Sequence, residues 1–226
     1  MKERPILFSA PMVLAILDGS KTQTRRSMKI DPNLNIRASP FVASGIETTH
    51  GHEIRNPHGS PGDQLWVRET FFAFGRWETR FSKKKKRDEW HFIDMTADCD
   101  RVYQYAADNP DVPVAHRGGV MPGWWKRPAI FMPRAASRIQ LEITEIRVER
   151  LQNISEEDAV AEGIKISCDA RRSVACYGIY ECRMPDGKTY FNDSAYELYK
   201  ILWNQINGAG SWYANPFVWV ISMKVV

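Results

Sequence analysis

The chain has 226 residues, of which 43% are hydrophobic and 26% are charged, a composition typical of water-soluble globular proteins. It contains no run of 18 apolar residues, and its first residues lack the apolar core of a signal peptide, so we expect a cytoplasmic protein without membrane contacts. The net charge of +4 is compatible with a nucleic-acid partner but does not require one.

The first predicted elements are a short strand at residues 6–8 and a helix at residues 11–17. Ser9 is placed to cap this helix, and Gly19 is placed to end it. Residues 19–26 then read Gly-Ser-Lys-Thr-Gln-Thr-Arg-Arg, a segment dense in cationic and hydroxyl side chains. Such a segment at a helix end suits a site for an anionic or polar ligand, and it equally suits the basic edge of a surface strand.

The middle of the chain is irregular and charged. Residues 29–62 are polar and contain several Pro, Gly and Asn residues, which predicts a long loop, and residues 64–70 predict a strand. Residues 75–100 predict a charged excursion from the core, followed by a short strand at 102–105. The strongest basic patch lies in this excursion and is typical either of a solvated loop or of a nucleic-acid contact: Lys83, Lys84, Lys85, Lys86 and Arg87.

Residues 137–151 carry the clearest alternation in the sequence. Ile139, Leu141 and Ile143 fall on one side and polar residues on the other, which predicts a half-buried strand.

Two capping boxes predict the later helices. The first begins at Ser155, and Gly163 ends its helix, so Glu162 becomes the last helical residue. A carboxylate at this position opposes the helix dipole unless a cation or a function compensates for it. The second box begins the last helix at residue 194, and a final strand follows at 217–220.

The sequence predicts neither a metal nor a cofactor. Its four cysteines include no Cys-x-x-Cys pair, so we expect reduced thiols. His50, His52 and His58 lie in a polar loop without an obvious carboxylate or thiolate partner. No phosphate-binding glycine loop or dinucleotide fingerprint occurs.

Gly19, Lys21 and Arg26 match the Gly-x-Lys-x-x-Glu-x-Arg signature of the ASCH family, which the chain resembles. The segments at 61–70, 132–138 and 215–219 are similar to those of longer, phage- and prophage-borne ASCH proteins. The resemblance implies an α+β fold with a PUA-like small β-barrel, flanking helices and long loop insertions. It implies one domain over residues 1–226, with insertions near 29–62, 75–130 and 165–192.

Thr24 stands where the ASCH signature has Glu, as in the small ASCH proteins that hydrolyse N4-acetylcytidine. The resemblance therefore implies a metal-independent amidohydrolase that acts on an N4-acylated cytidine or a similar modified pyrimidine nucleoside. In this hypothesis Thr24 is the nucleophile, Lys21 is its base, and Glu162 relays a proton. A neutral lysine base requires desolvation or a neighbouring cation, such as Arg25 or Arg26.

Further substrate contacts are expected from Arg26, Trp66, Arg68 and Glu69. Trp66 is suited to stacking on a base, and Arg68 to binding a carbonyl or a phosphate. The alternatives are that Trp66 is a core aromatic and that Arg68 and Glu69 are an ordinary polar pair on a strand.

A second hypothesis is a non-catalytic reader of a modified base or of nucleic acid, with RNA favoured over DNA. Arg25 and the basic run at 83–87 would then contact phosphates. A ribonuclease is a third hypothesis, because lysine can act as a general base or bind phosphate. The sequence does not predict the oligomeric state.

Overall fold

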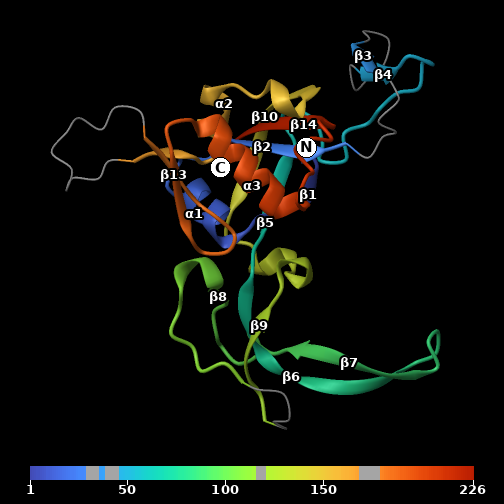
Figure 1. Cartoon of the computed structure of the whole chain (residues 1–226). Helices are drawn as coiled ribbons and strands as arrows, with labels where there is room; N and C mark the ends of the chain where they lie inside the picture. Colours follow the sequence, from blue (N-terminus) through green and yellow to red (C-terminus); the bar gives the residue numbers. More distant parts are fainter. Residues whose placement is uncertain (29–35, 39–45, 116–120, 168–178) are drawn as a thin grey trace, which may run out of the picture. The chain divides into compact units, whose positions relative to one another are not determined.

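The computed structural model of the protein describes residues 1–28, 36–38, 46–115, 121–167 and 179–226. It is a mixed α+β structure in which strands dominate (Figure 1). The chain divides into two compact units. Unit 1 comprises residues 1–6, 11–67 and 139–226, and unit 2 comprises residues 7–10 and 68–138.

Unit 1 is built on a five-stranded sheet. Its strand order is β1 (Glu3–Leu7), β5 (Gln64–Arg68), β10 (Gln140–Arg150), β14 (Phe217–Val225) and β2 (Gln23–Ser27). The pairs β5–β10, β10–β14 and β14–β2 are antiparallel, and the register of β10 on β14 shifts between Ile143 and Glu145. Among the described strands, this ladder ends at β1 and at β2 and does not close into a barrel.

Smaller elements of unit 1 surround this sheet. The helices are α1 (Ala10–Leu17), α2 (Glu156–Ala161) and α3 (Ala195–Asn207), with a 3-10 turn, η4, at Leu151–Asn153. A three-stranded sheet contains β11 (Lys165–Ile166), β12 (Tyr180–Arg183) and β13 (Thr189–Asn192), and β3 (Ile36–Ala38) pairs with β4 (Ile46–Thr48).

The core of unit 1 lies between α3 and one face of the large sheet. Leu198, Tyr199 and Leu202 of α3 are buried in one cluster with Val218 and Val220 of β14. These α3 residues recur at helical spacing, whereas the two valines alternate as on a strand, so each element contributes one apolar face.

Unit 2 is a second antiparallel sheet. Its long strand β6 (Phe71–Ser82) pairs with β7 (Arg87–Asp94), β8 (Gln104–Tyr105) and β9 (Gly123–Arg127). The described part of unit 2 also contains the 3-10 turns η1 (Ala106–Asp108), η2 (Ala129–Phe131) and η3 (Arg134–Ala136). Its core contains Phe71, Ala73, Met132 and Ala136.

Several predicted elements are confirmed. Ser155 and Ser194 accept hydrogen bonds from the backbone N–H groups of Asp158 and Glu197, as the two capping boxes predict. The alternating segment at 137–151 contains strand β10, and Ile139, Leu141 and Ile143 are buried.

Other predictions need correction. The cap at Ser9 is wrong, because the buried Ser9 hydroxyl has no hydrogen-bond partner among the described residues. The segment at 29–62 is not wholly a loop, since it contributes β3 and β4, although residues 29–35 and 39–45 lie outside the described part. The charged excursion predicted at 75–100 is not contradicted, and most of it forms the β6–β7 hairpin.

Candidate active site

Backbone hydrogen bonds bring Lys21 beside the end of α2. The Lys21 N–H donates to the Ala15 carbonyl over 2.8 Å, and the Thr22 N–H donates to the Ala161 carbonyl over 2.9 Å. Lys21 and Glu162 also form an isolated antiparallel β-bridge. The chain between α1 and β2 is thereby joined to the C-terminus of α2, so two segments far apart in sequence meet at one point.

The side chains of Lys21 and Glu162 form a buried ion pair. The Lys21 Nζ lies 2.7 Å from Glu162 Oε2, and the two side chains are 0% and 2% exposed. Nζ also donates to the carbonyl oxygens of Glu162 and Gln23, each over 2.9 Å. The three acceptors match the three protons of an ammonium group, so the resting pair is ionic.

Arg25 extends this pair into a buried network. Its side chain is 0% exposed and contacts Glu149 at 2.6 Å, Asp158 at 2.7 Å and Glu162 at 3.4 Å. Asp158 and Glu162 are four residues apart and face the same side of α2, which explains why one guanidinium reaches both. Because Arg25 is enclosed by carboxylates, it is not displayed at the surface for phosphate contact.

Burial sets the protonation chemistry of the site. Desolvation lowers the pKa of Lys21, and the charge of Glu162 only partly opposes this shift. Desolvation raises the pKa of Cys182 to about 11 despite the neighbouring Lys21, and it raises the pKa of Tyr199 well above its ordinary value, with the charge of Glu162 acting in the same direction. The Cys182 thiol and the Tyr199 hydroxyl are therefore neutral at pH 7. Lys21, in contrast, gives up its proton more readily than a free lysine.

Thr24 is buried on β2, where it pairs with Ile221 of β14. Side chains alternate along a strand, so Thr24 and Arg26 fall on the face opposite Gln23 and Arg25. The backbone N–H of Met223 in β14 donates to the carbonyl of Thr22. Because successive carbonyls along a strand point in opposite directions, the carbonyl of Gln23 points away from β14, and it accepts a hydrogen bond from Lys21 Nζ. The Lys21 amine therefore lies at the outer edge of β2.

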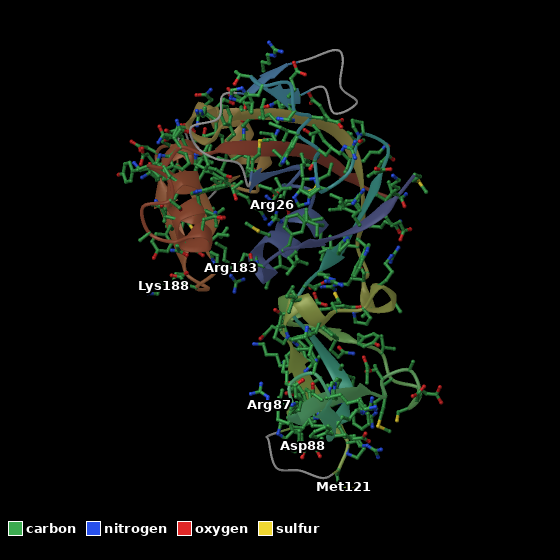
Figure 2. All side chains as sticks on the ribbon, turned by 90° about the vertical axis from the view of Figure 1, so that its right-hand side faces the viewer. Arg26, Arg87, Asp88, Met121, Arg183 and Lys188 are labelled. Carbon is green, nitrogen blue, oxygen red and sulfur yellow. The ribbon has the colours of Figure 1, made fainter. Side chains whose placement is uncertain are left out.

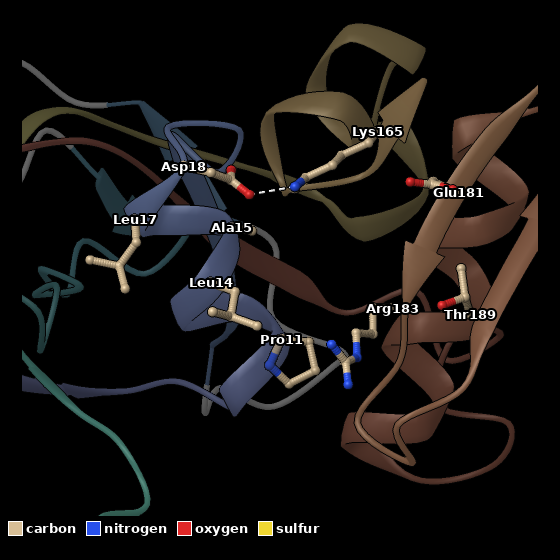
Figure 3. Close-up of a pocket in the computed structure, with 10 residues that line it drawn as sticks. Pro11, Leu14, Ala15, Leu17, Asp18, Lys165, Glu181, Arg183 and Thr189 are labelled. Carbon is tan, nitrogen blue, oxygen red and sulfur yellow. Dashed lines mark hydrogen bonds and ion pairs between the residues drawn. The ribbon is translucent and has the colours of Figure 1, made fainter. Parts of the chain in front are cut away.

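A cavity of about 570 Å³ lies next to the Lys21–Glu162 pair. Figure 3 shows it between α1 and the β12–β13 strands, with an ion pair between Asp18 and Lys165 at one side and Arg183 extending toward α1. Ala15 and Gly163 line it. A Cβ atom built on Gly163 would lie 3.1 Å from Ala15 Cβ and 3.3 Å from Lys21 Cβ, so this part of the wall directly adjoins the lysine side chain.

Arg26 belongs to the opposite face of the large sheet. It pairs with Trp219, which lines a second cavity of about 430 Å³ together with Arg4. Burial and the charges of Arg26 and Arg4 lower the pKa of His58 to about 4. His58 is consequently neutral at pH 7.

The remaining predicted substrate residues are divided between the two units. Trp66 is a buried residue of β5 in unit 1 and pairs with Gln140 of β10, as expected of a core aromatic. In unit 2, Arg68 donates to the Ile130 carbonyl, and the buried Glu69 binds Arg138 at 2.9 Å. Burial raises the pKa of Glu69, although the hydrogen bond from Arg138 opposes the shift.

The basic run from Lys83 to Arg87 lies in unit 2 at the turn between β6 and β7, and all five residues are exposed. Lys85 and Arg87 both contact Glu89, at 2.7 and 3.5 Å. Figure 2 shows the Arg87 side chain extending away from the ribbon at this end of the hairpin.

Sequence reasoning missed the acidic partners of Arg25. Asp158 lies in the first turn of the helix that the first capping box predicts, and it also binds Arg147 at 2.7 Å. Its position one turn before Glu162 was the signal that could have identified a two-carboxylate helix face. Glu149 and Tyr199 carried no such signal, because both sit in segments whose pattern indicates only a strand and a core helix.

Within the described residues, no three His, Cys, Asp or Glu side chains gather in a manner suited to a metal ion. Cys99 and Cys182 are free thiols, and the other two cysteines lie outside the described part. No helix in the described part of the chain is long and apolar enough to cross a bilayer. Comparisons with protein-family models, curated proteins and solved structures found no match.

Proposed function

We propose that the protein is a metal-independent amidohydrolase of the ASCH type, with a PUA-like core, that deacylates an N4-acylated cytidine or a similar modified pyrimidine nucleoside. The observation that carries this proposal is the buried contact of 2.7 Å between Lys21 Nζ and Glu162. A lysine with a lowered pKa beside a carboxylate is the arrangement that base catalysis near neutral pH requires.

The reaction begins with proton transfer inside the pair. The ammonium of Lys21 passes a proton to Glu162, which converts two buried charges into two neutral groups. The neutral amine then takes the hydroxyl proton of Thr24 as Thr24 Oγ forms a bond to the acyl carbon. The carbonyl π electrons move to oxygen, giving a tetrahedral oxyanion.

The intermediate then releases cytidine. The oxyanion electrons re-form the carbonyl, the bond between the acyl carbon and N4 breaks, and Lys21 returns its proton to N4. Water, deprotonated by the same amine, next attacks the acyl-threonine, which frees the carboxylic acid and restores the Thr24 hydroxyl. Glu162 finally returns its proton to Lys21, so no proton is gained or lost by the protein over the cycle.

The cavity beside Gly163 is the proposed substrate site. Its volume of about 570 Å³ lies within the range typical of small-molecule sites. Lys165 and Arg183 supply donors on its lining and Asp18 and Glu181 supply acceptors, a mixed set that suits the polar edge of a pyrimidine better than an apolar ligand. Because Lys21 is fully buried, substrate entry requires displacement of the wall formed by Ala15 and Gly163.

A second candidate function is recognition of nucleic acid without catalysis. The exposed basic turn at 83–87 favours it, because five neighbouring cations attract phosphate. The two candidates differ at Thr24, whose hydroxyl is essential to the hydrolase and irrelevant to a reader of phosphates.

The test is a chromatographic assay of cytidine release from N4-acetylcytidine. The wild-type protein is expected to turn over, whereas Lys21→Ala and Thr24→Ala are expected to lose at least about a hundredfold in rate. Lys200→Gln removes a lysine from a partly exposed ion pair with Glu197 and serves as the matched control with unchanged rate. A folded wild-type protein without turnover contradicts the proposal.

A further inference from the structure

The β6–β7 hairpin is the most extended feature of unit 2 (Figure 1). Its strands pair without interruption from Gly75 with Asp94 to Ser82 with Arg87. Beyond Trp77 and Phe92, its outer part exposes most side chains on both faces.

The two faces of this hairpin differ in chemistry. Pairing of Trp77 with Phe92 and of Thr79 with Trp90 places aromatic residues on one face, and Phe81 follows two positions beyond Thr79. We call Trp77, Phe81, Trp90 and Phe92 the aromatic face. The opposite face carries charged residues such as Arg76, Glu78 and Arg80, which form ion pairs with one another.

The aromatic face is anchored at one end and open at the other. The rings of Trp77 and Phe92 meet edge to face at 5.4 Å between centroids, and the Arg127 guanidinium lies 4.9 and 4.5 Å from their centroids. In contrast, Phe81 is 64% and Trp90 68% exposed. The anchored rings hold the base of the hairpin, so the two outer rings are presented to solvent on a supported strand pair.

Charge is concentrated beside the exposed rings. The turn after Ser82 consists of Lys83, Lys84, Lys85 and Lys86, and Arg87 begins the return strand. Glu89 contacts Lys85 and Arg87. In the part of the chain that the structure describes, Lys83, Lys84 and Lys86 have no carboxylate within ion-pair distance.

We propose that this hairpin binds single-stranded RNA, with bases stacked on Phe81 and Trp90 and phosphates held by the lysines of the turn. Exposed aromatic rings can stack on bases, and neighbouring lysines without a carboxylate partner can bind phosphates, so this surface suits a single-stranded nucleic acid. Phe81 and Trp90 lie two strand positions apart, about 7 Å, so each exposed ring has room to stack one base. A duplex does not fit this surface because its bases are already stacked and paired.

The choice of RNA over DNA rests on the proposed function, since the substrate proposed there is a ribonucleoside. The binding surface itself does not depend on that function, because no residue of the hairpin belongs to the Lys21–Glu162 site.

The first test is fluorescence anisotropy of the full chain with a short labelled RNA that lacks self-complementarity. Trp90→Ala and Phe81→Ala are each expected to weaken binding about tenfold, as expected for the loss of a stacked base. Both residues are exposed, so the substitutions leave the core intact. Tyr213→Ala removes a similarly exposed ring, 74% accessible, from unit 1 and is expected to bind like wild type.

The second test is the salt dependence of the same binding. Replacing Lys83, Lys84 and Lys86 by Gln is expected to reduce the slope of log K against log salt by about 2, since each phosphate contact contributes about 0.7 on a single strand. Lys188→Gln, at the β12–β13 turn of unit 1, is the control and is expected to leave the slope unchanged.

Four results would overturn the proposal: no RNA binding by wild type at low salt, Trp90→Ala and Phe81→Ala both binding within twofold of wild type, an unchanged salt slope in the triple variant, or duplex RNA binding as tightly as single strands. Equal or tighter binding of the matching DNA strand overturns the choice of RNA. If the wild-type protein binds RNA as expected but releases no cytidine, in contrast, the proposed function is refuted and the RNA-binding surface is supported.

Discussion

At the scale of single residues, the candidate site depends on two charges that compensate each other away from water. Lys21 and Glu162 are almost completely buried, and Glu162 has a second cationic neighbour in Arg25. Removing one member of such a pair leaves an uncompensated charge or forces a change of protonation state, either of which costs more than the pair contributes.

We therefore predict that Glu162→Gln lowers the free energy of unfolding by about 3 kcal/mol at pH 7. Urea denaturation measures this change. Lys200→Gln breaks a partly exposed pair and is expected to change the free energy by less than about 0.5 kcal/mol. If Glu162→Gln is as stable as the Lys200→Gln control, removing one charge of the buried pair has no cost, which contradicts the prediction.

His58 gives a separate prediction about pH. Its pKa falls from 6.5 to about 4 on folding, so the unfolded chain binds an extra proton between these values and stability decreases as the pH falls through this window. We expect this loss to total about 2 kcal/mol after allowance for partial exposure. His58→Gln should remove it, and unfolding curves measured from pH 7 to pH 4 test this. Equal losses in both proteins would contradict the assignment.

At the scale of elements, the site depends on how α2 ends. Gly163 follows Glu162 with φ +101°, a conformation that favours glycine, and its Cα faces Ala15 and Lys21. The turn at this residue lets the chain leave α2 while Glu162 stays against Lys21.

Gly163→Ala is predicted to lower the free energy of unfolding by about 2 kcal/mol, from backbone strain together with contacts of 3.1 and 3.3 Å that require neighbouring atoms to move. Gly187→Ala is the matched control, because Gly187 has φ +83° but nothing within 4 Å of an added Cβ. The control should lose about 1 kcal/mol. If urea denaturation shows that Gly163→Ala and Gly187→Ala lose the same free energy of unfolding, a Cβ atom at residue 163 fits beside Lys21 without moving its neighbours, which contradicts the prediction.

Much of the secondary structure could be predicted from the sequence, because the signals are local. Capping boxes fix α2 and α3 through hydrogen bonds three residues apart, and alternation marks β10 through burial of Ile139, Leu141 and Ile143. The pairing of β6 with β7 was not predicted, since most of its residues are exposed on both faces and alternation in polarity is weak there.

The site itself was less accessible to sequence reasoning. Lys21 and Glu162 are 141 positions apart, so only a resemblance to a family linked them. The network around Arg25 could not be predicted, because its partners Glu149 and Asp158 lie on different elements and each has an ordinary local explanation.

At the scale of the whole molecule, the chain separates its two proposed chemistries into two compact units. The Lys21–Glu162 pair lies in unit 1, and the aromatic face lies in unit 2. Each unit has its own apolar core, so we expect changes in the outer hairpin to leave the core of unit 1 intact.

Replacing residues 78–91 by Asn-Gly is predicted to preserve unit 1. The turn rejoins the strands just beyond the pair of Trp77 and Phe92, with residues that favour a tight hairpin. Hydrogen exchange measured by mass spectrometry should show unchanged protection of β10 and β14 and lost RNA binding. Loss of protection in those strands would contradict the independence of the two cores.

The proposed mechanism requires Lys21 and Glu162 to exchange a proton during catalysis, and the pH dependence of kcat/KM for N4-acetylcytidine reports on this exchange. In the wild-type protein the Lys21 proton stays within the pair, so the rate should not rise with pH through the pKa of Lys21. In Glu162→Gln no carboxylate accepts this proton, so Lys21 must lose it to solvent: the maximal rate should fall, and the rate should now rise with pH through the lowered pKa of Lys21. An unchanged profile with an unchanged maximum would show that the pair is structural and would contradict the mechanism.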